Sequence, residues 1–129
     1  NQPVIARGEV SFNELEEIHN KMETLLGKEG AYLDAIYYCP HHPHKGYEGE
    51  RPELKIDCDC RKPKPGMLLK AAEDFNIDLS KSWMIGDGQN DIEAGINAGC
   101  KTVLIGDSNE NYGQTESKSS ILEFMKSLA

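Results

Sequence analysis

The sequence has no long apolar run, no excess of positive charge, and no basic segment followed by an apolar stretch near residue 1. Its longest apolar clusters, 35–39 and 102–105, have the length of strands, which excludes a membrane-spanning helix. Fourteen basic residues stand against twenty-two acidic ones, so the chain has no basic face for a phosphate backbone. We therefore expect a soluble, cytoplasmic protein that binds neither nucleic acid nor membrane.

The length of 129 residues fits one domain with a modest core. Residues 1–9 are typical of a loop that is already under way, and no initiator Met precedes them. We therefore expect residues 1–129 to form a single, partial domain of a longer protein.

Helices and strands alternate along most of the predicted chain. A Ser-x-x-Glu capping box at Ser11 begins a predicted helix that ends at Gly27. The helix has one apolar face. Further helices are predicted at 65–75, 91–98 and 121–128, and strands at 35–39, 83–85 and 102–105. This alternation predicts an α/β fold with a doubly wound parallel sheet that has helices on both faces.

Residues 40–65 carry five prolines. Two short groups of metal-binding side chains, Cys39-Pro-His41 and Cys58-Asp-Cys60, lie at the start and in the second half of this stretch. A loop this long is generally functional or held by something other than a core. Disulfide geometry is strained within a Cys-x-Cys pair, and in a reducing compartment such clusters favour a metal. Three thiolates and one imidazole suit a closed, structural zinc site.

The fourth ligand and the metal itself each have an alternative. His42 and His44 compete with His41, which is favoured because Cys-x-His mirrors the spacing of Cys-x-Cys. The cysteines could also be partly buried side chains that bind no metal. Cys100 stands alone and is expected to be a small buried residue.

Two polar segments predict an anion site. Asp87 follows a predicted parallel strand, at the edge where open α/β sheets bind ligands, and Asp91 lies four residues further on. Carboxylates of this kind hold Mg²⁺ together with substrate phosphate oxygens, although Asp91 is also well placed simply to cap the next helix. Arg61 and Lys62 follow the cysteine pair, and their alternatives are a phosphate contact or a solvated basic loop.

Four segments stand in the order and spacing of one family: Asn1-Gln-Pro-Val-Ile-Ala-Arg-Gly8, Cys39-Pro-His-His-Pro43, Cys58-Asp-Cys-Arg-Lys-Pro-Lys-Pro-Gly-Met67 and Ile85-Gly-Asp87. Together they resemble the zinc-containing branch of the haloacid dehalogenase-like phosphatases. Within that branch the pattern is most similar to the D-glycero-D-manno-heptose-1,7-bisphosphate 7-phosphatases, with the histidinol-phosphate phosphatases as a sister group. The resemblance implies the fold of that family, with a zinc-bound loop at 39–60 in place of a cap domain.

The resemblance also implies roles for individual residues. Lys62 resembles the lysine that neutralises the nucleophile and the phosphoryl group, and Asp87 resembles the acidic Mg²⁺ ligand. Substrate contacts are implied for Asn1, Arg7 and Arg61, beside Lys62. The zinc ligands that it implies are Cys39, His41, Cys58 and Cys60.

Two elements of the family pattern do not occur in this sequence, the nucleophile motif and the Ser/Thr of the second motif. The family nucleophile lies in an Asp-x-Asp motif on the first strand, whereas the Asp-x-Asp at 57–59 falls inside the cysteine-rich loop. We therefore expect an aspartyl-phosphate intermediate only in a longer parent protein, which would supply the missing N-terminal segment. This fragment alone is expected to be inactive.

The expected parent is a Mg²⁺-dependent phosphatase acting on a small phosphorylated substrate. A phosphorylated sugar such as heptose bisphosphate is the first candidate, and histidinol phosphate is the second. The alternative from another class is a non-catalytic zinc-binding module. The 16-residue loop 42–57 is long for either relative and could alter the substrate.

Overall fold

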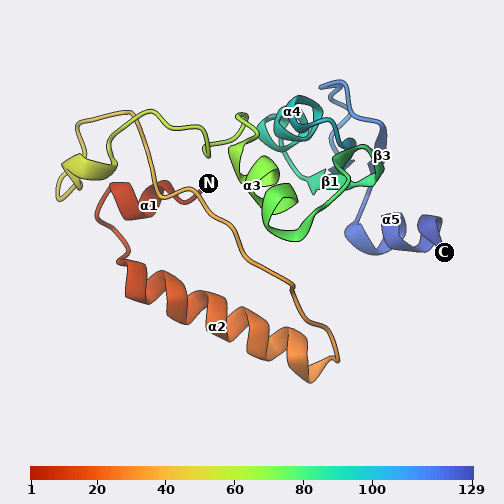
Figure 1. The fold of residues 1–129 in the computed structure, drawn as a ribbon, viewed down its shortest axis with the longest axis horizontal. Helices are drawn as coiled ribbons and strands as arrows, with labels where there is room; N and C mark the ends of the chain where they lie inside the picture. The colour runs from red at the N-terminus through yellow and green to blue at the C-terminus, as the bar shows by residue number, and fades with distance from the viewer. The chain divides into compact units, whose positions relative to one another are not determined.

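The computed structural model describes residues 1–129, which divide into two compact units, Asn1–Cys58 and Asp59–Ala129. The first unit contains α1 (Pro3–Ala6), α2 (Phe12–Lys28) and the short 3-10 helix η1 (Pro52–Leu54). The second contains the sheet and the remaining helices (Figure 1). No helix combines the length and the apolarity that crossing a bilayer requires.

The capping box predicted for α2 is confirmed. The Ser11 hydroxyl accepts a bond from the Glu14 N–H at 3.1 Å, and the Glu14 carboxylate accepts one from the Ser11 N–H at 2.8 Å. The predicted end at Gly27 is wrong, because the helix runs through Lys28. The left-handed residue after it is Gly30, with φ +75°. Two glycines three residues apart made the end ambiguous.

The predicted strand at 35–39 is also wrong. Residues 31–40 form no regular element, and the segment runs back beside α2 within the first unit (Figure 1). The ring centroids of His19 on α2 and Tyr38 lie 5.5 Å apart. β-forming side chains make a strand only where another strand pairs with them, and the first unit contains none.

The second unit confirms the α/β class with a parallel sheet. Its strands are β1 (Trp83–Gly86), β2 (Lys101–Ile105) and β3 (Glu116–Lys118), paired in the order β1-β2-β3 with both pairs parallel. Its helices are α3 (Gly66–Phe75), η2 (Leu79–Lys81), α4 (Gln89–Ala98) and α5 (Ile121–Leu128). The three α-helices and the strands β1 and β2 match the predicted ranges to within two residues, whereas η2 was not predicted.

Helices pack on both faces of this sheet. Trp83 of β1 meets Phe124 of α5, with ring centroids 5.0 Å apart. The next residue, Met84, meets Gly95 of α4. Successive side chains of a strand point to opposite faces, so α4 and α5 cover different sides. Ile92, Val103, Leu104 and Phe124 form the fully buried core between them.

The sequence patterns predict no element at residues 116–118, where the structure has a third strand. β3 is short and polar, and it is joined to β2 beside a pair of threonines. The Thr115 N–H donates to the Thr102 carbonyl at 3.0 Å, and the Thr102 N–H donates to the Thr115 hydroxyl at 3.0 Å. Backbone pairing rather than apolar burial holds this edge strand.

Two helical glycines offer a test of this packing. A Cβ on Gly95 would lie 2.6 Å from Thr102 Cγ2 and 2.7 Å from Met84 Cβ, whereas a Cβ on Gly27 would meet nothing within 4 Å. We expect Gly95→Ala to lower the free energy of unfolding by about 1–2 kcal/mol, because overpacking outweighs the gain in helix propensity.

The matched control is Gly27→Ala, which should raise the free energy of unfolding by up to about 1 kcal/mol. Urea denaturation of both variants measures the two changes. Equal stabilisation by both substitutions would contradict the close approach of α4 to the sheet.

Candidate functional site

The basic segment predicted to contact phosphate forms a tight turn ahead of α3. The Lys64 N–H donates to the Arg61 carbonyl at 2.9 Å, and the Asn97 side-chain amide of α4 donates to the Pro63 carbonyl at 3.1 Å. Gly66 begins α3 directly against the preceding turn, where a Cβ would lie 2.2 Å from the Asp59 carbonyl oxygen. A helix start on one side and α4 on the other therefore hold this turn.

Lys62 projects from the turn to a buried carboxylate on α4. Its ammonium donates a short hydrogen bond to Asp91, whose side chain is 12% exposed. The other oxygen of that carboxylate accepts bonds from the backbone N–H groups of Asp87 and Gly88, each at 3.2 Å. Burial alone would raise the pKa of Asp91, but the Lys62 ammonium and these backbone donors hold the pKa below its ordinary value. Asp91 is thus an anion that binds Lys62.

Asp87 is exposed directly after β1, at the carboxyl edge of the parallel sheet. Gly86 makes this arrangement possible, because a Cβ there would lie 2.1 Å from Asp91 Cβ. Lys62 and Asp87 both bind Asp91, one through its ammonium and the other through its backbone N–H. The structure therefore brings these two predicted residues to the same edge of the sheet.

Asp91 is the site residue that sequence reasoning left as a helix cap. Capping is confirmed, since its carboxylate accepts from the N–H of the N-cap residue Gly88. The bond to Lys62 joins positions 29 apart in the chain, which no local pattern reveals. The one available signal was the spacing of the two acidic residues, which places both of them around the first turn of α4.

The arrangement suits a doubly charged anion. An oriented ammonium and an exposed carboxylate that could hold a divalent cation lie at the same edge of the sheet, and Arg61 lies next to Lys62 in the same turn. Positive groups held in place before the reaction stabilise charge more effectively than mobile ones. The carboxyl edge of a parallel sheet is also the usual ligand edge of such folds.

The predicted metal ligands lie together. One ligand atom each from Cys39, His41, Cys58 and Cys60 falls within 4.8 Å of all the others. Cys39 Sγ is 3.5 Å from Cys58 Sγ, well beyond a disulfide bond, and 3.7 Å from His41 Nδ1. Sulfur atoms at about 2.3 Å from a tetrahedral zinc ion lie about 3.8 Å apart, so this group fits such an ion.

The competing side chains lie outside this group. His42 is buried and contacts the Lys55 ammonium through Nδ1 at 2.8 Å. The His44 ring packs against that of His42, with centroids 5.3 Å apart. Cys100 is half-buried, and burial raises the pKa of its thiol. Of the three histidines in this loop, only His41 belongs to the cluster.

The other two predicted substrate contacts, Asn1 and Arg7, belong to the first unit. Asn1 is half-buried ahead of Gln2, whose N–H donates to the Cys39 carbonyl at 2.8 Å. Arg7 ends α1 and pairs with Glu9 through two nitrogens, Nε at 2.9 Å and Nη2 at 3.1 Å. Their substrate roles stay predictions.

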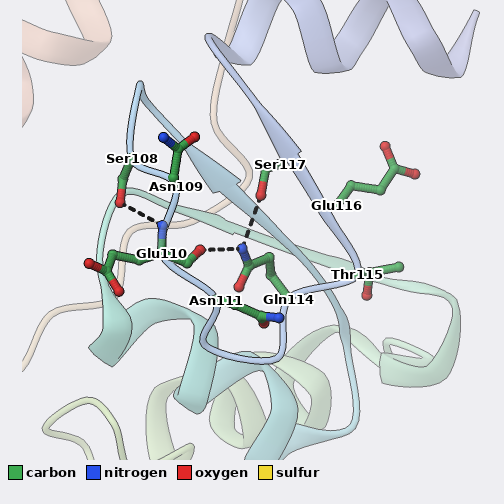
Figure 2. Close-up of a pocket in the computed structure, with 8 residues that line it drawn as sticks. All are labelled: Ser108, Asn109, Glu110, Asn111, Gln114, Thr115, Glu116 and Ser117. Carbon is green, nitrogen blue, oxygen red and sulfur yellow. Dashed lines mark hydrogen bonds between the residues drawn. The ribbon is translucent and has the colours of Figure 1, made fainter.

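A polar hollow lies along the connection between β2 and β3 (Figure 2). The Gln114 amide donates to the Glu110 carbonyl at 2.9 Å and to the Ser117 hydroxyl at 3.0 Å, which closes the connection on itself. The lining contains two carboxylates, Glu110 and Glu116, and no basic side chain. A phosphate group would be repelled there, so this hollow is distinct from the predicted anion site.

Several known proteins are similar to this chain in sequence. Residues 59–123, about half of the chain, match the family described as HAD-hydrolase-like. The chain is 48% identical over 106 residues to D-glycero-beta-D-manno-heptose-1,7-bisphosphate 7-phosphatase of Pasteurella multocida (strain Pm70), covering 81% of this chain and 55% of that protein. It is 46% identical over 101 residues to the protein of the same name from Haemophilus influenzae, covering 78% and 52%. The chain thus spans about half the length of the curated relatives it matches.

A solved structure is similar over the whole chain. It is D,D-heptose 1,7-bisphosphate phosphatase from B. bronchiseptica complexed with magnesium and phosphate, with a TM-score of 0.80 and 30% identity over 100% of this chain and 72% of that one. With the family match over residues 59–123, this similarity shows that the chain belongs to the haloacid dehalogenase-like hydrolases.

Proposed function

We propose that this chain is part of a phosphatase that hydrolyses a phosphorylated sugar, with heptose 1,7-bisphosphate as the first candidate. The observation that carries the proposal is the group of Lys62, Asp91 and Asp87 at the carboxyl edge of a parallel sheet. The sugar class rests on relatives named as heptose-1,7-bisphosphate 7-phosphatases. We assign residues 1–129 to one partial hydrolase domain that acts in the cytoplasm.

Lys62 offsets the negative charge of the phosphoryl group during transfer. Its bond to the Asp91 carboxylate fixes the ammonium in position. Arg61 belongs to the same turn and contacts the substrate beside Lys62. Asn1 and Arg7 are further substrate contacts in this proposal.

In this proposal the attacking carboxylate would come from an Asp-x-Asp segment of the full-length protein, outside residues 1–129. Its oxygen forms a bond to phosphorus while the bond from phosphorus to the sugar oxygen breaks, and the second aspartate protonates that oxygen. Water then attacks phosphorus and gives a proton to the second aspartate, which releases inorganic phosphate and restores both aspartates. Two such steps replace one difficult displacement.

The exposed carboxylate of Asp87 suits Mg²⁺, which is usually held by one or two carboxylates together with phosphate oxygens. When bound, Mg²⁺ supplies positive charge beside the phosphoryl oxygens. The backbone N–H of Asp87 donates to Asp91, which holds the backbone that carries this carboxylate.

Cys39, His41, Cys58 and Cys60 are the zinc ligands in this proposal. Four protein ligands leave no position for water, so the ion would be structural. It would join the two ends of the 42–57 loop, which has a single 3-10 turn of its own. The loop would then act in place of a cap domain.

Loss of the Lys62 ammonium tests the central observation. In the full-length protein, we expect Lys62→Gln to lower kcat/KM for heptose bisphosphate by about 10²- to 10³-fold, since it removes a preorganised positive charge. Lys70 forms an exposed pair with Asp74 in the same unit, so Lys70→Gln is the matched control and should leave kcat/KM unchanged. Steady-state kinetics with near-normal activity in Lys62→Gln would overturn the proposal.

Loss of the Asp87 carboxylate tests the metal role. We expect Asp87→Asn in the full-length protein to lower turnover of an aryl phosphate by at least about 10-fold and to raise the Mg²⁺ concentration for half-maximal rate. Asp78, an exposed cap of η2, provides the control Asp78→Asn. The 129-residue chain by itself should show no turnover. Activity in that short chain that survives Asp87→Asn would defeat the assignment.

Zinc binding is tested by metal analysis. We expect about one zinc ion per chain by elemental analysis, and a chelator should lower the melting temperature. Cys60→Ser should lose most of the zinc, whereas Cys100→Ser should keep it, because Cys100 lies outside the ligand group. Equal zinc content in the two variants, or none in the unaltered chain, would remove the zinc site.

A further inference from the structure

The loop 42–57 folds around a buried ammonium group. The Lys55 side chain is 1% exposed, and its Nζ lies 2.8 Å from His42 Nδ1 and 3.6 Å from the Glu50 carboxylate. That carboxylate also accepts bonds from the N–H groups of Gly46 and Tyr47, at 3.1 and 3.2 Å. Burying a charged amine is unfavourable unless partners surround it, so these contacts define one conformation of the loop.

The aromatic ring of Tyr47 lies at the edge of this cluster. The Lys55 ammonium is 4.7 Å from the ring centroid, within the range of a cation–π interaction. The His42 ring packs against the same ring at a centroid distance of 5.3 Å. Tyr47 is nevertheless 40% exposed, so part of the ring stays at the surface while the buried groups hold its position.

The loop is joined to α1 beside Arg7. The Arg51 N–H donates to the Ala6 carbonyl at 2.7 Å, and a Cβ on Gly8 would lie 1.9 Å from the Gly49 carbonyl oxygen. Gly8 also has φ +73°, a conformation that glycine adopts without strain. Backbone contacts on both sides of Arg7 therefore bring the loop to this residue.

Tyr47 supplies a surface for the Arg7 guanidinium. The Cζ atom of Arg7 lies 5.4 Å from the centroid of the Tyr47 ring, and Glu9 binds one edge of the same guanidinium. The Arg7 side chain is 24% exposed. A long flexible side chain held over a ring and along one edge has lost much of its rotational freedom before any anion arrives.

We propose that Tyr47 is a positioning residue, which orients Arg7 to bind an anionic group of the substrate. The proposal rests on the phosphatase function proposed above. It gives the long loop a specific role: the Lys55 cluster holds Tyr47, and Tyr47 holds the guanidinium. The chemistry recognised is that of a phosphate group on a small polar molecule.

The test compares Tyr47→Leu, which removes the aromatic face, with Tyr47→Phe, which keeps it. In the full-length protein, we expect Tyr47→Leu to raise KM for heptose bisphosphate by about 2- to 30-fold with little change in kcat, the range that a cation–π contact accounts for. Tyr47→Phe should leave KM at the value of the unaltered protein. Tyr32→Leu, at an aromatic residue that is 83% exposed, is the matched control and should change neither constant.

A double variant separates positioning from a general effect on stability. In an Arg7→Ala background, Tyr47→Leu should have no further effect on KM, because the group that it positions is gone. An unchanged KM in Tyr47→Leu, or an equal increase with and without Arg7, would overturn the proposal.

A second measurement is independent of turnover. Side-chain ¹⁵N NMR of the same protein should show a shifted Nε–H signal for Arg7 and greater picosecond-to-nanosecond motion in Tyr47→Leu, but not in Tyr47→Phe. If the unaltered full-length protein hydrolyses neither heptose bisphosphate nor an aryl phosphate, the phosphatase function fails. The NMR measurement alone then decides the role of Tyr47. Unchanged Arg7 motion in Tyr47→Leu would refute that role.

Discussion

An ion pair between a turn and a helix organises the second unit. Asp91 receives the Lys62 ammonium on one oxygen and two backbone N–H groups on the other, so one buried carboxylate connects the basic turn, the end of β1 and the start of α4. Gly86 leaves the space that this carboxylate occupies. A buried charge without its partner is strongly destabilising, so the pair constrains the fold as well as the chemistry.

Local sequence patterns predicted those parts of the fold that depend on local contacts. Ser11 and Glu14 satisfy each other within one helical turn, and the alternation of β1, α4 and β2 follows from apolar spacing. The strand predicted at 35–39 failed because pairing depends on a neighbour that a single segment does not contain. β3 escaped notice for the opposite reason, since backbone bonds beside Thr102 and Thr115 hold a polar segment in the sheet.

In the candidate site, too, local spacing predicted some features and distant contacts stayed hidden. The spacing of the cysteines and His41 indicated a cluster, and the structure brings one ligand atom of each to within 4.8 Å of the others. Residue spacing alone could not exclude His42, which turns instead toward Lys55. The partner of Lys62 was also hidden, because Asp91 has a sufficient local role as a cap. The sequence around Asp91 indicates its local role as a helix cap, but not its bond to a distant lysine.

The two ends of the 42–57 loop lie close together, at His41 and Cys58. Closing a flexible loop becomes less favourable only slowly with its length, by about 0.6 kcal/mol for each doubling. A change in loop length therefore costs little in closure entropy, whereas an exchange of His42, Tyr47 or Lys55 would remove the contacts that hold the loop in one conformation. Under the proposed function, this segment is where substrate preference can change while Lys62 and Asp87 keep their places.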